Sequence, residues 1–221
     1  MTRYIFIGDI HGCIAELREL LDRIAPGPAD RVVSVGDIVD KGPDPRACIE
    51  LWMEHGYLAV RGNAEEKLLR RRDQAIDELG EEGTTWIERL PLQLVFPEID
   101  VLTIHGGLFP DMKPTAEEIE RNRDAVLKLR FVRWSDDLWI RVPRGEEKEG
   151  DRFWSTLWEG PPLVVYGHHP TQAPEPRLDR MAIGLDTGCV YGGALSAVVF
   201  EQSGGYDLVS VPARRSYFGV S

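Results

Sequence analysis

Three apolar segments in the first third of the chain each lead into a glycine-containing polar loop. The apolar segments are Tyr4–Ile7, Arg31–Val35 and Tyr57–Val60. Each loop is followed by apolar residues at helical spacing, over Cys13–Ile24, Pro45–His55 and Glu65–Leu79. Strands that alternate with helices predict an α/β sheet whose ligand site lies at the carboxyl ends of its strands. We therefore expect the three polar loops to share one edge of the sheet.

The rest of the chain has a β-rich pattern. The strand-like stretches are Leu92–Phe96, Val101–Ile104, Val164–Tyr166, Met181–Leu185, Leu195–Phe200 and Tyr206–Val211. Within this half, roughly residues 110–162 begin with a capping box at Thr115 and Glu118. We interpret this segment as a helical, cap-like insertion over the site, within a single domain of residues 1–221. Two interpretations stay open for the tryptophans of this segment: they pack a small lobe, or they stack on a nucleobase. These tryptophans are Trp134, Trp139, Trp154 and Trp158.

Charge and cysteine content exclude several classes of protein. The 221 residues carry a net charge of −11, which argues against broad binding of nucleic acids or of anionic membranes. No apolar run has the length of a signal-peptide core or a membrane span. The three cysteines, Cys13, Cys48 and Cys189, are too few and too scattered for a disulfide framework or a cysteine zinc site. We expect a cytoplasmic protein.

Polar side chains gather directly after the predicted strands. Carboxylate, imidazole and amide groups without thiolates suit manganese, iron or zinc better than calcium or a structural zinc ion. The number of these groups predicts two ions, with Asp37 as the carboxylate that bridges them. The remaining predicted ligands are Asp9 and His11 for one ion, and Asn63, His105 and His168 for the other.

Each of these motifs also has an ordinary structural explanation when it is taken alone. An aspartate at a strand end is often a helix cap, and a single histidine is often a hydrogen-bonded core residue. The convergence of four of the five histidines on one edge favours a metal site instead. His55 is the exception and is interpreted as a surface residue near a helix end, whereas the role of His169 beside the ligands is left open.

Together these motifs resemble the phosphoprotein-phosphatase branch of the calcineurin-like metallophosphoesterases. The matching stretches are GDIHG at 8–12, GDIVDKG at 36–42, RGNAE at 61–65, HGGLFPD at 105–111 and Gly167–His168. The segment Leu185–Gly193 is similar to bacterial members, which include symmetrical dinucleoside-tetraphosphate hydrolases and small Ser/Thr phosphatases. The resemblance implies a central β-sandwich flanked by helices, two metal ions that are often manganese, and hydrolysis by a water that the metals activate.

The resemblance also implies which residues bind phosphate. The six metal ligands match those named above, and Asn63 lies beside the phosphate as well. Arg61 matches the arginine that pairs with phosphate oxygens, and Lys41 stands where the family often has arginine, so it keeps the charge but loses the planar fork. A further arginine normally comes from the later region, where Arg130 and Arg133 are both candidates.

Ala64 departs from the family pattern. The family has a histidine at this position, which protonates the leaving group and is oriented by the aspartate that matches Asp40. Because Asp40 and all the ligands are retained, we interpret Ala64 as a deliberate replacement of the acid. The alternative is a natural variant with a substituted acid.

These observations predict a metal-dependent phosphatase that hydrolyses phosphate monoesters of proteins or small molecules. A symmetrical dinucleoside-tetraphosphate hydrolase and a catalytically impaired phosphate-binding protein are the alternatives. General acid catalysis matters most for an alkoxide leaving group, so Ala64 should impair monoester hydrolysis more than anhydride hydrolysis. Because the chain is acidic, attraction of a phosphorylated substrate must come locally from the metals, Arg61 and Lys41.

Overall fold

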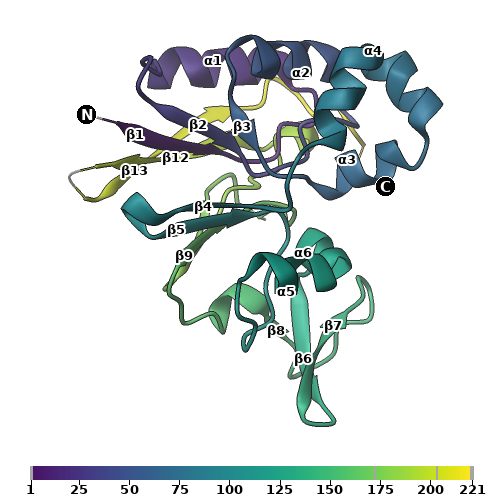
Figure 1. Ribbon diagram of the computed structural model, residues 1–221, viewed down its shortest axis with the longest axis vertical. Helices are drawn as coiled ribbons and strands as arrows, with labels where there is room; N and C mark the ends of the chain where they lie inside the picture. Colours follow the sequence, from purple (N-terminus) through teal and green to yellow (C-terminus); the bar gives the residue numbers. More distant parts are fainter. Residues whose placement is uncertain (1, 172, 203, 220–221) are drawn as a thin grey trace.

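Two five-stranded sheets form the centre of the computed structural model, which describes residues 2–171, 173–202 and 204–219 (Figure 1). The first sheet has the order β13 (Tyr206–Pro212), β12 (Ala194–Glu201), β1 (Arg3–Ile7), β2 (Arg31–Ser34) and β3 (Leu58–Ala59). The second has the order β10 (Arg177–Asp179), β11 (Ala182–Gly184), β9 (Leu163–Tyr166), β5 (Val101–Ile104) and β4 (Gln93–Phe96). The β-sandwich that the resemblance implied is confirmed.

Strand direction sets where the polar loops lie. β1, β2 and β3 are parallel neighbours, and β5, β9 and β11 are parallel neighbours in the other sheet. β12 and β13 extend the first sheet in antiparallel fashion, and β4 and β10 are antiparallel edges of the second. Because parallel strands end at the same edge, the loops after β1, β2 and β3 meet there, as the sequence predicted.

Alternation along β1 divides its side chains between two cores. Tyr4 and Phe6 face the second sheet. The Phe6 ring packs edge-on against Phe96 of β4 in that sheet and Phe200 of β12 in its own, with centroid distances of 5.2 and 5.8 Å. Ile5 and Ile7 face the helices on the other side. This two-residue period is the pattern of a strand that is buried on both faces.

A helical layer covers the outer face of the first sheet (Figure 1). Its members are α1 (Ile14–Ile24), α2 (Pro45–Glu54), α3 (Asn63–Leu69) and α4 (Arg72–Glu88). The single helix predicted over Glu65–Leu79 is wrong in its continuity, because the chain breaks between α3 and α4. Its predicted end at Leu79 coincides with a kink in α4, where Gly80 has a non-helical φ of 77° and ψ of 169°. Residues 70–73 at the break are all exposed, so they bury no side chain that would hold one continuous helix against the sheet. Among the helices of the described ranges, none has the length and apolarity to span a bilayer.

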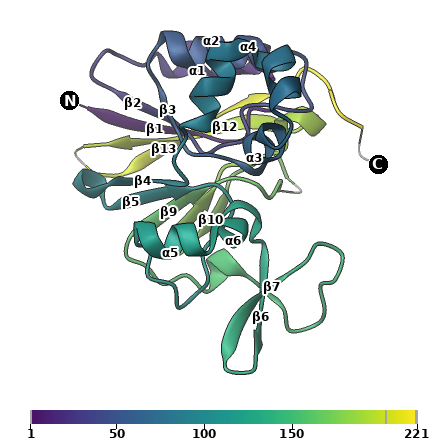
Figure 2. The same ribbon diagram turned by 45° about the vertical axis from the view of Figure 1, so that its right-hand side comes forward.

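Residues 110–162 lie at the opposite end of the molecule from the helical layer (Figures 1 and 2). They contain α5 (Ala116–Arg121) and α6 (Arg123–Lys128). Thr115 caps α5 by accepting a hydrogen bond from the Glu118 amide, but the predicted capping box is only half formed, because the Thr115 amide donates to the Lys113 carbonyl. The pattern predicted no strands here, yet an antiparallel sheet follows: β7 (Leu138–Val142), β6 (Phe131–Ser135) and β8 (Arg152–Phe153). Short 3-10 turns complete the fold: η1 (Pro97–Ile99), η2 (Trp154–Thr156) and η3 (Cys189–Tyr191).

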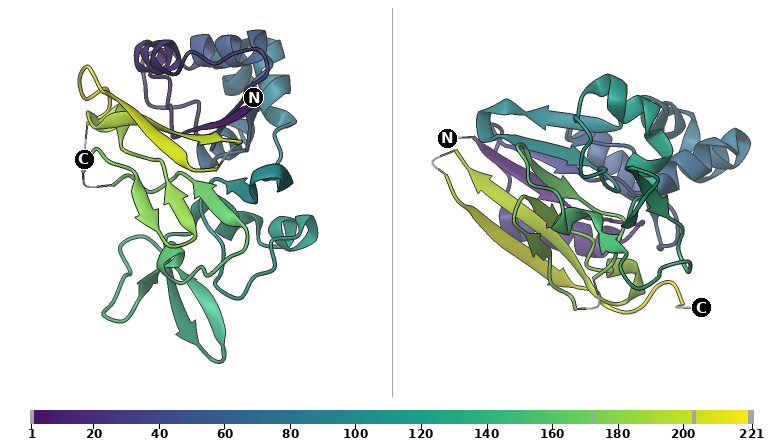
Figure 3. Two further views of the ribbon diagram at one scale, coloured as in Figure 1. Left: turned by 90° about the vertical axis from the view of Figure 1, so that its left-hand side faces the viewer. Right: turned by 90° about the horizontal axis from the view of Figure 1, so that it is seen from below.

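Three of the four tryptophans of this segment, Trp139, Trp154 and Trp158, pack in or against one hydrophobic core. Trp154 and Trp158 are buried in the core between the second sheet and α5 and α6, whereas Trp134 is 54% exposed. Figure 3 shows the same stacking of layers from two further sides. Three hydrophobic cores therefore lie between the layers, and the central one lies between the two five-stranded sheets.

Replacement of Phe6 by alanine tests the central core. Phe6→Ala should lower the free energy of unfolding by about 3–5 kcal/mol, because it removes a fully buried ring and leaves a cavity between the sheets. Urea denaturation followed by circular dichroism measures the change. Val95→Ala is the control, since Val95 is 53% exposed on β4 and its loss should cost about 0.5 kcal/mol or less. Equal losses for the two variants would contradict this packing.

Candidate functional site

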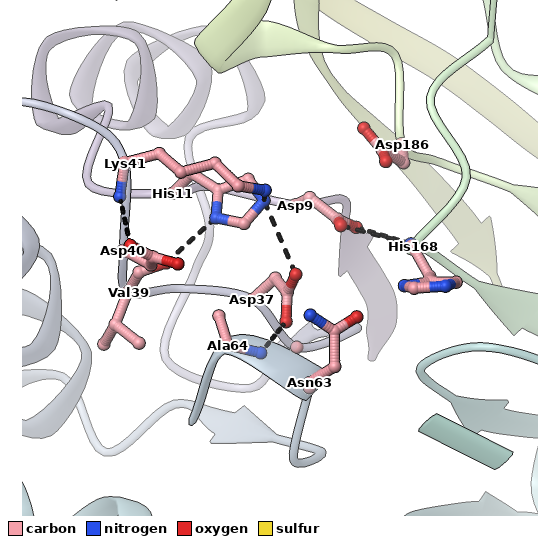
Figure 4. Close-up of polar contacts among 12 residues, drawn as sticks. Asp9, His11, Asp37, Val39, Asp40, Lys41, Asn63, Ala64, His168 and Asp186 are labelled. Atoms are coloured by element: carbon pink, nitrogen blue, oxygen red, sulfur yellow. Dashed lines mark hydrogen bonds and ion pairs between the residues drawn. The ribbon is translucent and has the colours of Figure 1, made fainter. Parts of the chain in front are cut away.

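Five loops bring the six predicted ligands to one place, and Figure 4 labels five of them, all except His105, which lies beside Asp37 and Asn63. Asp9 and His11 follow β1, Asp37 follows β2, and Asn63 begins α3 just after β3. His105 follows β5 and His168 follows β9, from the second sheet. Asp9, His11, Asp37 and His105 are buried side chains. Both sheets thus contribute to the site at the edge where their parallel strands end.

Asp37 lies at the centre of this cluster. Its carboxylate has one oxygen 3.4 Å from Nε2 of His11 and the other 3.2 Å from Nε2 of His105. The second oxygen also accepts a hydrogen bond of 2.7 Å from the Ala64 amide. A carboxylate between two imidazoles fits the predicted bridging role, which stays a prediction.

Backbone carbonyls orient two of the imidazoles. Nδ1 of His11 lies 2.9 Å from the Val39 carbonyl oxygen, and Nδ1 of His105 lies 2.9 Å from that of Val35. A carbonyl only accepts, so in a neutral ring the proton is on Nδ1 and the Nε2 lone pair points inward. Nε2 of His105 also lies 3.2 Å from Oδ1 of Asn63. These atoms present lone pairs to a common space, as metal ligands do.

Buried negative charge gives a second reason to expect a cation. Burial raises the pKa of Asp9 well above its usual value, and the neighbouring carboxylates of Asp186 and Asp37 raise it further. Burial also raises the pKa of Asp186. Ligand atoms of Asp9, Asp37 and His105 lie within 4.8 Å of one another, so one divalent cation could contact all three. The donor set fits the metal centre that the sequence predicted.

His168 completes the cluster from the second sheet. Its amide donates to both oxygens of Asp9, at 3.2 and 3.1 Å. Burial lowers the pKa of its imidazole well below the usual value, with further lowering from His105 and Arg130. The ring is therefore neutral at physiological pH, which is the form that binds metal ions.

Two carboxylates beyond the predicted set shape the site. Glu65 is fully buried and accepts hydrogen bonds from the amides of Asp37, Ile38 and Gly62, so it holds the second and third loops together. Its place in the first turn of α3 after Gly62 is the signal that could have found it. Asp186 follows β11 directly, which is the same strand-end position that identified the other ligands.

Glycine is required where these loops meet. A Cβ atom at Gly62 would collide with the backbone and carboxylate of Asp37, and one at Gly167 would collide with the carboxylate of Asp9. The glycines of the two motifs therefore let neighbouring loops approach the ligands more closely than any side chain would allow.

The structure separates the two candidate arginines of the later region. Arg130 is half-buried, donates 3.1 Å to the His168 carbonyl and lines the cavity described below. Arg133 instead makes two bonds of 2.7 Å to the carboxylate of Asp151 and does not line the cavity. Arg130 is thus the one placed to reach a ligand.

Lys41 and Arg61 have different surroundings. Nζ of Lys41 lies 2.9 Å from Nε2 of His11 and faces the site. The guanidinium of Arg61 donates 2.7 Å to the Glu88 carbonyl at the end of α4 and pairs with Glu66 at 3.3 Å, outside the cavity lining. The phosphate-binding role of Arg61 stays a prediction.

Position 64 carries no acid, although Asp40, the aspartate that the resemblance assigns to orienting one, is present. Ala64 is buried, and the Asp40 carboxylate pairs with Lys67 at 3.2 Å.

His169 lines the cavity, with its ring 4.8 Å from that of Phe153, and burial together with Arg130 lowers its pKa to about 4. His55 is exposed, as predicted.

A cavity of about 1280 Å³ opens over the cluster. Metal-ligand candidates form its floor, and three cations reach it, namely Lys41, Arg130 and Arg144. Tyr191 and Phe218 supply an aromatic wall, in which their ring centroids are 6.3 Å apart and Nζ of Lys41 lies 5.4 Å from the Tyr191 ring. None of the four tryptophans of residues 110–162 lines it in the described part of the chain.

Comparisons with known proteins agree with this geometry. The model of the calcineurin-like phosphoesterase family matches residues 2–210. An asymmetrical bis(5'-nucleosyl)-tetraphosphatase of Halalkalibacterium halodurans is 30% identical, over 96% of this chain and 95% of the relative. A symmetrical bis(5'-nucleosyl)-tetraphosphatase of Chromohalobacter salexigens is 30% identical, over 87% and 92%. The solved structure of a proposed diadenosine tetraphosphatase has a TM-score of 0.83 and 33% identity, over 96% of this chain and 93% of that one.

Buried negative charge should govern the stability of the metal-free protein. A carboxyl whose pKa is raised by folding binds its proton more tightly in the folded state than in the unfolded chain, so its ionisation at higher pH favours unfolding. The metal-free protein should therefore lose stability as pH rises above about 4 and through the raised pKa values of Asp9 and Asp186.

Asp186→Asn should raise the free energy of unfolding of the metal-free protein at pH 7 by about 1 kcal/mol or more, because it removes one of the buried charges. Urea denaturation with a chelator present measures it, and the gain should vanish below about pH 4. Asp207→Asn is the control, since Asp207 is exposed on β13. A gain that persists unchanged in acid would rule out this charge effect.

Proposed function

The chain belongs to the calcineurin-like phosphoesterase family, and from that premise we propose that it is a metal-dependent hydrolase that cleaves a phosphoanhydride bond of a dinucleoside tetraphosphate. The family makes it a hydrolase of phosphoester or anhydride bonds. The similar proteins named above are tetraphosphatases, which favours the nucleotide substrate over the phosphate monoester that the sequence pattern put first.

The observation that carries the proposal is the composition of the cavity. The candidate metal ligands, the cations Lys41, Arg130 and Arg144, and the aromatic wall of Tyr191 and Phe218 all line this one cavity. A nucleobase stacks on an aromatic ring while the attached phosphates pair with lysine and arginine. One cavity therefore supplies contacts for a base and for a polyphosphate chain, whereas a small phosphate ester would use only its floor.

Ala64 is consistent with this substrate. Cleavage of a tetraphosphate releases a nucleotide whose terminal phosphate departs as an anion without prior protonation. An alkyl monoester releases an alkoxide, which needs an acid, and position 64 offers only a methyl group. The missing histidine therefore costs least for an anhydride.

The candidate ligands form two sets, one for each metal ion. Asp37 with Asp9 and His11 would hold one divalent ion, and Asp37 with Asn63, His105 and His168 the other, with manganese as our proposal and iron or zinc as alternatives. When bound, such ions activate water for attack on phosphorus and offset charge on the phosphoryl oxygens.

Arg130 binds the phosphate chain from the side of the second sheet, and its partner, the His168 carbonyl, fixes its direction. Lys41 binds the chain from the side of the first sheet, beside the Tyr191 ring. Both cations line the cavity that the candidate ligands also line, so both can pair with oxygens of the tetraphosphate. Their charge also offsets the repulsion that a chain of net charge −11 exerts on a polyanion.

Product analysis tests the proposal directly. Manganese-loaded protein should convert diadenosine tetraphosphate either to two molecules of ADP or to ATP and AMP, as separated by anion-exchange chromatography. The first result identifies symmetrical cleavage and the second asymmetrical cleavage. Asp37→Asn is the control, because loss of the central carboxylate should abolish turnover. Release of phosphate from a phosphoserine peptide together with an intact tetraphosphate would overturn the proposal.

Restoring the acid should separate the two substrate classes. Ala64→His should raise kcat on a phosphoserine peptide by about 10²-fold or more, since general acid catalysis contributes 10²–10⁴-fold to a poor leaving group. On diadenosine tetraphosphate the change should stay within about threefold, because the leaving group needs no proton. Steady-state phosphate release measures both, and Ala64→Asn controls for side-chain size. Equal gains on both substrates would contradict the leaving-group argument.

A further inference from the structure

A second cluster of possible metal ligands shares no residue with the site described above, although the thiol of Cys13 donates to the His11 carbonyl at 3.8 Å. It consists of the thiols of Cys13 and Cys189 and the carboxylate of Glu16, with one ligand atom from each within 4.8 Å of the other two. Cys13 precedes α1, Glu16 lies in its first turn, and Cys189 begins η3. The three are 0–1% exposed. The sequence suggested that the cysteines are too scattered to share a site, yet the fold brings together two that are 176 residues apart.

The hydrogen bonding of Glu16 is incomplete. One oxygen of its carboxylate accepts from the Arg214 amide at 2.9 Å and from the Tyr217 hydroxyl at 2.7 Å. The other oxygen is buried and has no hydrogen-bond partner among the described residues. A buried carboxylate oxygen without a donor is costly, and a cation is one way to satisfy it. The free oxygen belongs to the residue that lies beside the two thiols.

We propose that Cys13, Glu16 and Cys189 form a zinc site, separate from the phosphate-binding centre. Zinc is a borderline-soft ion that binds both soft thiolates and carboxylates, whereas the thiolate-free set at the other centre suits harder ions. Binding of one zinc ion would release the two thiol protons to solvent. Three protein ligands leave the fourth tetrahedral position for a small exogenous ligand.

The start of α1 favours anionic ligands at this place. Cys13 occupies its N-cap position and Glu16 its first turn, where the unpaired amides of an 11-residue helix carry partial positive charge. This effect lowers the cost of gathering two thiolates and a carboxylate in the core.

Zinc here would connect segments that shape the cavity. Cys13 follows the loop of Asp9 and His11, and Cys189 lies two residues before the cavity-lining Tyr191. Through Glu16 the site also reaches the C-terminal segment at Arg214 and Tyr217. The ion would hold the metal-ligand loop and the aromatic wall at a fixed separation.

Cadmium titration of the reduced, manganese-loaded protein tests the site. A thiolate-to-cadmium charge-transfer band should rise in the ultraviolet and saturate at one ion per chain. Cadmium that enters the other centre adds no such band, because that centre has no cysteine. Cys13→Ser and Cys189→Ser should each lose the band, and Glu16→Gln should keep it with affinity about tenfold weaker.

Cys48→Ser is the matched control, since Cys48 is a third buried cysteine in the same core but outside the ligand set. It should keep the full band. Absence of the band from the natural chain, equal loss in Cys48→Ser, or unchanged affinity in Glu16→Gln would overturn the proposal.

A measurement on the unmodified chain covers the case in which the serine variants fail to fold. Alkylation by iodoacetamide, followed by peptide mass spectrometry, gives a separate rate for each cysteine. Zinc should slow the modification of Cys13 and Cys189 at least tenfold relative to Cys48. Equal slowing of all three, or of none, would overturn the proposal.

Discussion

The position of Asp37 is the constraint on which the rest of the site depends. Its carbonyl oxygen accepts hydrogen bonds from the amides of Ile10 and His11, and its own amide donates one to the Glu65 carboxylate. Its carboxylate lies between the imidazoles of His11 and His105. Its backbone has a φ of 54°, in the left-handed region that a non-glycine residue adopts only when surrounding contacts hold it there. One residue therefore connects three loops and both sheets, and the positions of the ligands follow from it.

The buried carboxylates of the site require positive charge nearby. The chain is acidic overall, and the site concentrates buried carboxylates that raise one another's pKa, as at Asp9 and Asp186. Lys41 and Arg130 stand at the edge of this cluster, facing the cavity. Long-range repulsion of anions is screened within about 8–10 Å in physiological salt, so these local cations govern the final approach of a phosphate. The same buried charge that weakens the metal-free protein gives a metal ion its binding energy.

The two ends of the chain cooperate in forming the cavity. The first loop supplies Asp9 and His11, and the helix that follows it holds the C-terminal segment through Glu16. That segment carries Phe218, which faces Tyr191 across the aromatic wall. Metal ligands and aromatic wall are thus coupled through one helix, rather than through the second sheet, whose outer face packs against the helices of residues 110–162.

Local spacing in the sequence was enough to predict the three strand–loop units and the gathering of the six candidate ligands at one edge, because a side chain just past a strand has its position set by that strand. Side-chain choices that depend on distant packing were not predictable. Arg130 and Arg133 are three residues apart, and only the Asp151 pair and the His168 carbonyl decide which one faces the cavity. The proximity of Cys13 to Cys189 and the pairing of β6 with β8 likewise depend on contacts between separate segments. The sequence by itself determined the chemistry available at each strand end, whereas the tertiary structure decided which of those groups share a cavity, because hydrophobic burial between layers fixes their relative positions.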